Sequence, residues 1–287
     1  MLQIDNLVFN AWNRRFFDSA SVSLPVGAKV GLVGRNGVGK TTLFKLILGE
    51  LVPDGGDISL PKTARIASVD QEHPASPASL LDTILAADLE REALNGELET
   101  APPERLGDIY ARLIEIDADR APARAAEILA GLGFSTADLA RPMAEFSGGW
   151  RMRVALASAL FAEPDLLLLD EPTNYLDLEG ALWLEARLKK YPHAALIISH
   201  DRELLNRSVD AILHDPPRFG IAGELYSQVF YDHLARVIKR KGRLFHYTGT
   251  PNKLTSGRDV PNEVAKRLRQ AGFATELVGD GIVASRR

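Results

Sequence analysis

The chain has no cysteine, no long apolar segment and no secretory N-terminus, and each absence excludes a class of protein. Without cysteine among its 287 residues, it has neither a disulfide framework nor a thiolate metal site. Its longest apolar runs, Leu166–Leu169 and Ala194–Ile198, fall far short of the roughly 20 residues that a membrane span needs. The N-terminus, MLQIDNLVFNAWNRRFF, has no basic start that leads into an apolar stretch, so we expect a cytoplasmic protein with no transmembrane segment.

The composition is that of a globular protein, but the charge is divided unevenly. Hydrophobic residues make up 46% and charged residues 25% of the chain, which is ordinary for a soluble protein with one large or two modest domains. Residues 1–213 carry 21 Lys and Arg against 31 Asp and Glu, whereas residues 214–287 carry 13 against 7. The basic tail is either a solvated helix around Arg236–Arg243 or a binding surface, and charge alone leaves both open.

Short apolar runs alternate with helical patterns, which predicts a parallel sheet covered by helices. The expected strands are 29–33, 165–169 and 195–198, and the expected helices are 40–48 and 178–189. Two earlier runs, 6–9 and 20–24, are typical of antiparallel edge strands. Residues 74–145 are rich in Ala, Glu, Leu and Arg and are interrupted at Pro102 and Pro103, which indicates a helical insert in two pieces.

A glycine-rich segment joins the strand at 29–33 to the helix at 40–48. It consists of Gly34, Arg35, Asn36, Gly37, Val38, Gly39, Lys40, Thr41 and Thr42. In the context of strand, loop and helix, this spacing predicts a phosphate loop. We expect backbone N–H groups to converge on a β-phosphate at the positive end of the helix. Lys40 should reach the β- and γ-phosphate oxygens, and Thr41 should hold Mg²⁺.

Carboxylate, amide and imidazole side chains occur at strand ends expected near this loop. Asp170 ends the strand at 165–169 and is predicted to hold the metal, directly or through water. Glu171 follows it and is the natural base or orienter for an attacking water. Gln71, at a strand-to-helix junction, is a second candidate contact to metal and water, the alternative being a surface glutamine. His200 ends the strand at 195–198 and either contacts the γ-phosphate or is structural.

A second candidate phosphate contact lies far from the loop in the sequence. Ser147, Gly148 and Gly149 precede a helix expected over 150–161. The serine can cap the helix, and the glycines let a phosphate approach the unpaired N–H groups of its first turn. An ordinary capped turn is the alternative reading of the same residues.

Taken together, these segments resemble the ATP-binding cassette (ABC) family, in that family's order and over residues 1–213. The resemblance implies ATP and Mg²⁺ as cofactors and a second cassette as partner, in a homodimer or on another chain. It implies that the turn at Ser147, Gly148 and Gly149 closes over ATP held by the partner's phosphate loop. Asp177 would belong to the loop that faces the partner. Phe9 matches the aromatic residue that stacks on adenine, although a buried strand aromatic is the alternative.

Within the family, the segment FSGGWRMR at 146–153 resembles the ABC-F branch, whose soluble tandem-cassette members act on ribosomes. Trp150 stands where transporter cassettes usually have glutamine, and the helical insert is longer than transporters normally carry. Tyr175 replaces the histidine that is more common in its loop. Members of this branch have a linker and a second cassette, and neither is present here, so a truncated or fused chain is expected.

The tail resembles a different family. Asp215-Pro216-Pro217, and the segment 243–249 with the helix and two short strands after it, look like the C-terminal half of a class I S-adenosylmethionine-dependent methyltransferase. A plain turn is the alternative for Asp215–Pro217. Such enzymes hold their cofactor with a glycine-rich turn after the first strand, and the only such turn here is the phosphate loop, so no S-adenosylmethionine is expected. Residues 210–214 fit the end of a cassette and equally the fourth strand of such a methyltransferase, and we predict that two unrelated coding halves are fused there.

The sequence therefore predicts an α/β protein: a P-loop NTPase cassette at 1–213, with antiparallel edge strands and a helical subdomain at about 74–160, followed by a small α/β remnant at 214–287. The predicted function is that of an ABC-F-like, translation-associated ATPase that hydrolyses ATP to ADP and phosphate. Two alternative functions fit the same motifs. One is the ATPase subunit of an ABC transporter, and the other is a nucleotide-binding module without turnover.

Overall fold

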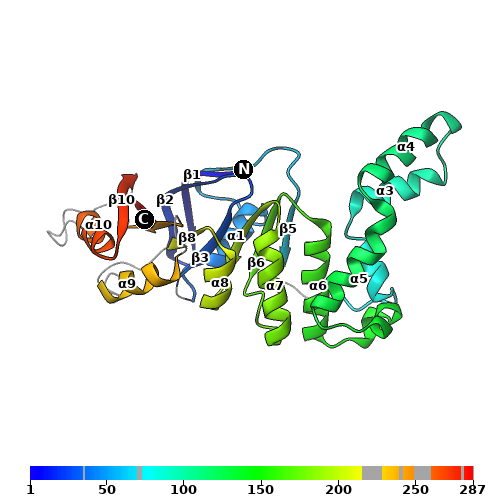
Figure 1. Cartoon of the computed structure of the whole chain (residues 1–287). Coiled ribbons are helices and arrows are strands. Elements are labelled where there is room, and N and C mark those ends of the chain that lie inside the picture. The colour runs from blue at the N-terminus through cyan, green and yellow to red at the C-terminus, as the bar shows by residue number, and fades with distance from the viewer. Residues whose placement is uncertain are drawn as a thin grey trace.

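Residues 1–34, 36–69, 73–214, 228–238, 242–248, 260–278 and 281–286 are described by a computed structural model of the chain. Within them the strands form one sheet of eight and one sheet of three, which Figure 1 shows with the helices around them. The large sheet has the order β10-β11-β9-β8-β3-β7-β6-β5. Its strands are β3 (Lys29–Val33), β5 (Ile66–Val69), β6 (Leu166–Asp170), β7 (Ala194–Ile198), β8 (Ala211–His214), β9 (Arg243–Tyr247), β10 (Phe273–Val278) and β11 (Gly281–Arg286).

The centre of the large sheet is parallel and buried on both faces, as the apolar runs predict. β3, β5, β6, β7 and β8 pair in parallel. The four leucines of β6 are 0% exposed. Because successive side chains of a strand point to opposite faces, Leu166 and Leu168 join one apolar cluster and Leu167 and Leu169 join the other. Only a sheet covered on both sides buries such a run completely.

One face of the large sheet is covered by α1 (Lys40–Ile47) and the small antiparallel sheet. That sheet has the order β2-β1-β4 and consists of β1 (Leu2–Ala11), β2 (Arg14–Leu24) and β4 (Gly55–Ser59). Leu2 of β1, Phe44 of α1 and Leu196 of β7 belong to the same buried cluster. The predicted antiparallel strands are therefore confirmed, and they form a sheet of their own with β4.

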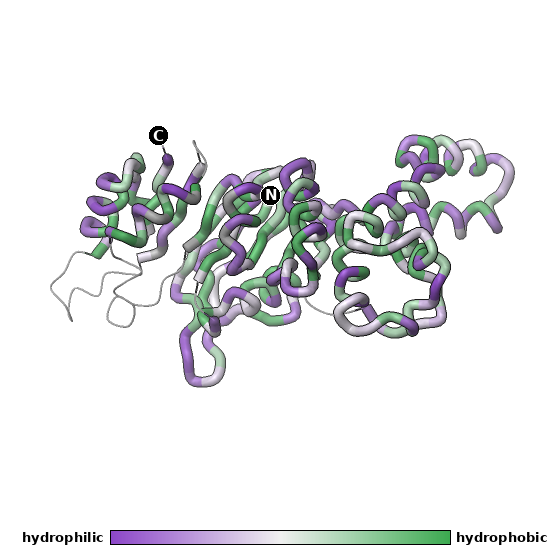
Figure 2. The backbone as a smooth tube through the Cα atoms, turned by 60° about the horizontal axis from the view of Figure 1, so that its bottom comes forward, coloured by the Kyte–Doolittle hydropathy of each residue, from purple (hydrophilic) through white to green (hydrophobic). Residues whose placement is uncertain are grey.

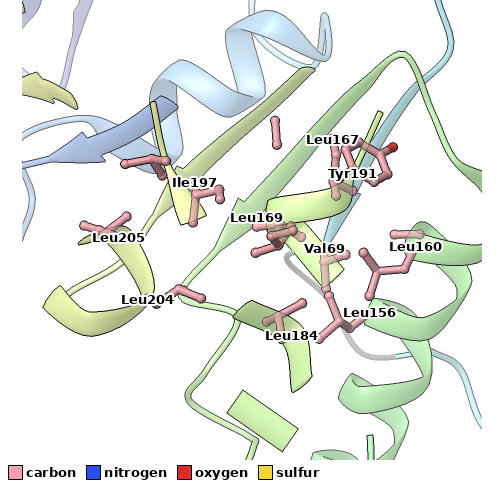
Figure 3. Packing of buried hydrophobic residues seen from close by; sticks show 14 of the residues in the cluster. Val69, Leu156, Leu160, Leu167, Leu169, Leu184, Tyr191, Ile197, Leu204 and Leu205 are labelled. Atoms are coloured by element: carbon pink, nitrogen blue, oxygen red, sulfur yellow. The ribbon is translucent and has the colours of Figure 1, made fainter. Parts of the chain in front are cut away.

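The opposite face is covered by helices. α6 (Gly148–Ala162), α7 (Leu178–Lys190) and α8 (Arg202–Ser208) supply its apolar side chains. Figure 3 shows side chains of β5, β6 and β7 meeting those of the three helices in one cluster. The strand ends that carry the candidate site are thus held between two packed layers.

The helical insert packs on α6 and extends away from the sheet. It contains α2 (Leu80–Leu85), α3 (Leu89–Leu98), α4 (Pro103–Glu115) and α5 (Ala121–Gly131), with short 3₁₀ helices at Ala118–Arg120, Thr136–Ala140 and Met143–Glu145. α3 and α4 form a hairpin that projects at one end of the molecule (Figure 1). α4 begins at Pro103, as expected where the two prolines interrupt the helical pattern, because proline is tolerated in a first helical turn.

The tail continues the large sheet. β9 pairs in parallel with β8, and β11 pairs antiparallel with both β9 and β10. α9 (Gln228–Val237) and α10 (Val260–Gln270) accompany these strands. Figure 2 shows apolar and polar residues alternating along α10, as in a helix with one buried face. No helix in the described part of the chain is long and apolar enough to cross a membrane.

Gly131, the last residue of α5, marks a close contact between the insert and α7. A Cβ added there would lie 2.0 Å from Cε2 of Trp183. Since overpacking typically costs about 1–3 kcal/mol, Gly131→Ala is expected to lower the melting temperature, measured by circular dichroism. Gly107→Ala is the matched control, because a Cβ on this exposed residue of α4 meets nothing within 4 Å. The control should gain up to about 1 kcal/mol from helix propensity. Equal melting temperatures for both variants would contradict this packing.

Candidate functional site

The glycine-rich segment forms a loop between β3 and α1. Gly37 and Gly39 have φ values of 74° and 114°, in the left-handed region that favours glycine. A Cβ on Gly39 would also lie 2.9 Å from Cδ1 of Phe16. Lys40 Nζ donates a hydrogen bond to the carbonyl oxygen of Gly34 at 2.8 Å, so the ammonium group folds back over the loop. An ammonium group beside the N-terminus of a helix is suited to bind an anion.

Asp170, at the end of β6, lies against this helix N-terminus. Thr41 Oγ1 donates a hydrogen bond to Asp170 Oδ2 at 2.5 Å, although the two residues are 129 positions apart in the sequence. The hydroxyl and the carboxylate form a pair of oxygen donors, which suits Mg²⁺. Burial lowers the pKa of Lys40, while the negative charges of Glu171 and Asp170 oppose that shift. The lysine and both carboxylates therefore share one electrostatic environment.

Glu171 is held in an unusual backbone conformation next to His200. Its φ is 48°, a conformation that costs a non-glycine residue energy and is found preferentially at functional sites. Its N–H donates to the carbonyl oxygen of Ile198 at 2.9 Å. The backbone N–H of His200 donates to Glu171 Oε2 at 3.1 Å. Glu171 Oε1 is buried without a hydrogen bond, although His200 Nε2 lies 3.3 Å away. The carboxylate thus keeps an acceptor atom available.

His200 also connects β7 to the phosphate loop. Its Nε2 lies 3.0 Å from Oδ1 of Asn36, and its side chain is largely exposed. The order β3-β7-β6 explains this contact, because the carboxyl ends of three adjacent parallel strands meet at one edge of the sheet. The structure therefore brings together Asn36, Lys40, Thr41, Asp170 and His200. The first and last of these residues are 164 positions apart in the sequence.

Two aromatic residues of the β1–β2 hairpin, Phe9 and Trp12, differ sharply in their exposure. Phe9 is only 7% exposed and belongs to the buried cluster, so little of its ring is open to a base. Trp12 is 81% exposed and lies edge-on to Phe16, with ring centroids 5.8 Å apart. Arg14 ties the same hairpin to the loop by donating to the carbonyl oxygen of Gly37 at 2.9 Å.

Trp12 is a further candidate that the sequence analysis did not name, although a signal was present. Trp12 and Asn13 both have positive φ and form the turn between β1 and β2. A tryptophan in such an exposed turn has no core to fill, which distinguishes it from Phe9 in the strand.

The serine-glycine turn begins α6 and is anchored away from the phosphate loop. Ser147 is the N-cap residue, yet its side chain makes no capping hydrogen bond, and the residue is exposed. Arg151 holds the turn from behind by donating to the carbonyl oxygens of Phe146 at 2.7 Å and His73 at 3.1 Å. Trp150 packs on Phe134 of the helical insert, with ring centroids 4.8 Å apart. The serine hydroxyl thus makes no capping hydrogen bond, while Arg151 and Trp150 hold the turn in place.

Asp177 begins α7 close to this turn. It accepts a hydrogen bond from the N–H of Gly180 at 2.9 Å, and Arg153 Nη1 donates to it at 3.2 Å. The pKa of Asp177 is lowered, first by the Gly180 hydrogen bond and then by Arg153. Arg153 also stacks over the Trp150 ring at 4.4 Å and donates to the carbonyl oxygen of Tyr175 at 2.7 Å. One arginine therefore joins the turn to the loop before α7.

The remaining predicted residues fall into two groups. Val38, Thr42, Gly148 and Gly149 lie in the two segments described above and are partly exposed. Arg35, Gln71 and the turn Asp215–Pro217 lie outside the described residues.

A parallel sheet with a glycine-rich loop at a helix N-terminus, and an adjacent carboxylate on its threonine, defines a P-loop nucleotide-binding protein. Comparison with known families narrows this class. Residues 17–174 match the family model described as ABC transporter, and the chain belongs to this family of ATP-binding cassettes.

Its curated relatives carry related descriptions. The chain is 44% identical over 218 residues to "Probable ATP-binding protein YheS" of Escherichia coli (strain K12), covering 75% of this chain and 34% of that protein. It is 44% identical over 225 residues to "ATP-binding cassette sub-family F member 3" of Homo sapiens, covering 74% of this chain and 31% of that protein. The chain thus spans about a third of the length of these relatives.

Solved structures share the fold. One described as "Structure of ATP binding subunit of ABC transporter" aligns with a TM-score of 0.58 at 20% identity, over 78% of this chain and 93% of the other. The "Dimeric structure of a post-hydrolysis state of the ATP-binding cassette MJ0796 bound to ADP and Pi" aligns with a TM-score of 0.53 at 19% identity, over 72% of this chain and 91% of the other. The comparisons give no support to the methyltransferase resemblance of residues 214–287.

Proposed function

We propose that this chain is an ABC-F-like ATPase domain that hydrolyses ATP to ADP and phosphate with Mg²⁺. The observation that carries the proposal is the 2.5 Å hydrogen bond between Thr41 and Asp170. It joins the phosphate loop to the strand whose next residue is Glu171. Without ATP chemistry, there is little reason to hold a hydroxyl, two carboxylates and a lysine at one helix N-terminus.

Each residue of the site has a distinct role in this proposal. Thr41 and Asp170 hold Mg²⁺, which when bound offsets the negative charge of the phosphates. Lys40 leaves its contact with Gly34 and reaches the β- and γ-phosphate oxygens. Glu171 accepts a proton from, or orients, the attacking water. His200 and Gln71 contact the γ-phosphate and its surroundings.

The second phosphate contact requires a second cassette. The turn at Ser147, Gly148 and Gly149 is held by Arg151, and Trp150 anchors it to the helical insert. The phosphate loop is instead anchored to the β1–β2 hairpin, Asp170 and His200. An exposed serine at an uncapped helix start then serves a nucleotide bound to the partner, and Asp177 lies on the same face. A homodimer or another chain supplies that partner.

A direct test is phosphate release from ATP by the purified chain. We expect turnover with Mg²⁺ and its loss when EDTA removes the metal, because the oxygen donors of the site suit this ion. Binding of ATP without phosphate release, at protein concentrations that allow two cassettes to meet, would overturn the proposal. It would favour the rival of a nucleotide-binding module without turnover.

The biological setting is proposed from the ABC-F resemblance. The name of the human relative places it in sub-family F, and the helical insert of this chain projects as the α3–α4 hairpin (Figure 1). We expect the chain to pellet with ribosomes and not to purify with a membrane protein. Purification with a membrane protein would favour the rival of a transporter subunit.

Residues 214–287 are proposed to be a remnant joined to the cassette within 210–214. The reversal of charge at this point supports a change of origin, and the tail strands extend the sheet from β8. The glycine-rich loop that a methyltransferase would need is used for phosphate here. We therefore expect no binding of S-adenosylmethionine, which isothermal titration calorimetry can measure.

Trp12 is proposed to stack on the adenine ring in place of Phe9. Stacking of a base on an aromatic side chain is worth about 1–3 kcal/mol. Trp12→Ala is therefore expected to raise the Kd for ATP by roughly 5- to 150-fold, measured with a fluorescent ATP analogue. Trp12→Phe should restore most of the affinity, because it keeps an aromatic face. An unchanged Kd in Trp12→Ala would remove Trp12 from the site.

A further inference from the structure

The outer edge of the large sheet is formed by β10. In the described part of the chain β10 pairs with β11 alone, and it ends the strand order. The six residues from Phe273 to Val278 pair with β11 in an unbroken register. Every second residue of an edge strand directs its N–H and C=O groups away from its only neighbour. β10 therefore presents a row of backbone donors and acceptors.

Within the residues that the structure describes, this edge lacks several features that normally prevent edge-to-edge pairing. Such edges are usually protected by lysine, proline or a bulge. β10 has the sequence FATELV, with one charge, at Glu276, and its register with β11 is regular. Leu277 and Val278 are 52% and 46% exposed. An apolar, regular and unprotected edge is suited to accept another strand.

We propose that β10 pairs antiparallel with β10 of a second copy of this chain. The two sheets then become continuous across a two-fold axis, and the dimer forms without nucleotide. This dimer is separate from the ATP-dependent closure of two cassettes. The proposed function uses the phosphate loop and Ser147, whereas this interface uses only the tail.

The strand is complementary to its own copy in one register. A two-fold axis perpendicular to the sheet pairs residues of the same face. It pairs five of the six residues of β10 only when it passes beside Thr275 or beside Glu276. The second choice places two Glu276 carboxylates directly opposite each other, and like charges in that position are unfavourable. The first choice pairs Thr275 with Thr275 and Phe273 with Leu277. Threonine pairs and apolar pairs stabilise neighbouring strands by about 0.2–1 kcal/mol each.

The environment of Phe273 favours this register further. Phe273 is 2% exposed beneath α10, beside the buried Val264 and Leu268. Leu277 of the second copy would extend this apolar layer and lose its own exposure to water. Arg269 opposes pairing slightly: its Nε donates to Thr275 Oγ1 at 2.7 Å, so two guanidinium groups lie on the face near the axis. Added salt should therefore strengthen the dimer, since it screens like charges.

A single introduced cysteine tests the register directly, because the chain has none of its own. Residues opposite each other in antiparallel strands have Cα atoms about 4.5–5.5 Å apart, within the range of disulfides. Thr275→Cys should therefore form a cross-linked dimer under mild oxidation, seen on a non-reducing gel. Ala274→Cys is the matched control, because in this register its own copy lies two residues along the strand. Equal cross-linking of both variants, or none at position 275, would overturn the proposal.

Sedimentation without nucleotide tests the interface independently of ATP chemistry. The Lys40→Ala variant should sediment as a dimer at micromolar concentration, and added Leu277→Lys should make it a monomer. Val229→Lys is the control, because Val229 of α9 is 63% exposed and lies outside β10. Circular dichroism establishes that each variant is folded. The interface is overturned if the folded Lys40→Ala variant is a monomer. It is also overturned if the variant that carries both Lys40→Ala and Leu277→Lys is still a dimer. Neither result affects the proposed ATPase function.

Discussion

Glu171→Gln is expected to stop ATP turnover while leaving ATP binding intact. Glutamine keeps the size of the side chain but cannot accept a proton, and a positioned base typically contributes about 10²- to 10⁴-fold to a rate. The contacts of Lys40, Thr41 and Asp170 remain, so ATP still occupies the site. Phosphate release in a single turnover should fall by that factor. Because the nucleotide then persists between two cassettes, the sedimenting mass should rise with ATP and fall with ADP.

The control for this experiment is Glu104→Gln. Glu104 is an exposed acid in the first turn of α4, on the projecting α3–α4 hairpin (Figure 1), and its loss removes the same charge away from the site. This variant should hydrolyse ATP normally and show no trapped species. A Glu171→Gln variant whose mass does not change at saturating ATP would contradict the mechanism with two cassettes.

Lys40→Ala is expected to have the largest effect on nucleotide affinity. Hydrogen bonds to charged groups are worth about 1.5–3 kcal/mol, so the Kd for ATP should rise roughly 10- to 150-fold. Turnover should fall to background, because the lysine also contacts the γ-phosphate in the proposal. Burial lowers the pKa of Lys40, which means that the folded protein holds this charge at a cost.

Lys45→Ala provides the comparison on the same helix. Lys45 is an exposed residue in the last turn of α1, at the end of the helix away from the phosphate loop. Equilibrium binding of a fluorescent ATP analogue to both variants measures the difference. An equal Kd for the two would show that Lys40 does not contact the phosphates.

Much of the fold could be predicted from local patterns. The four leucines before Asp170 predict a strand buried on both faces, because a short continuous apolar run is typical of strands in a covered parallel sheet. The loop from Gly34 to Thr41 was predictable for a similar reason, since its glycines, lysine and threonine each meet a separate steric or chemical requirement. The helical insert followed from its composition and from the break at Pro102.

Other features depended on packing that no local pattern records. Phe9 and Trp12 are three residues apart in the sequence, yet one is buried and the other is 81% exposed. The difference comes from α1 and the large sheet, which cover one face of β1 and leave its turn open. The left-handed conformation of Glu171 and its contact with His200 arise because β6 and β7 are neighbours in the sheet.

The sequence by itself determined which residues form the phosphate loop, the acid pair Asp170 and Glu171 and the serine-glycine turn, because spacing of one or two residues defines each of these motifs. Tertiary structure alone decided that Thr41 reaches Asp170 and that Asn36 reaches His200, across separations of 129 and 164 residues. It also decided that the tail extends the large sheet and leaves β10 at the edge. Strand order sets these distances, and strand order follows from the burial of whole faces, which no short segment of the chain contains.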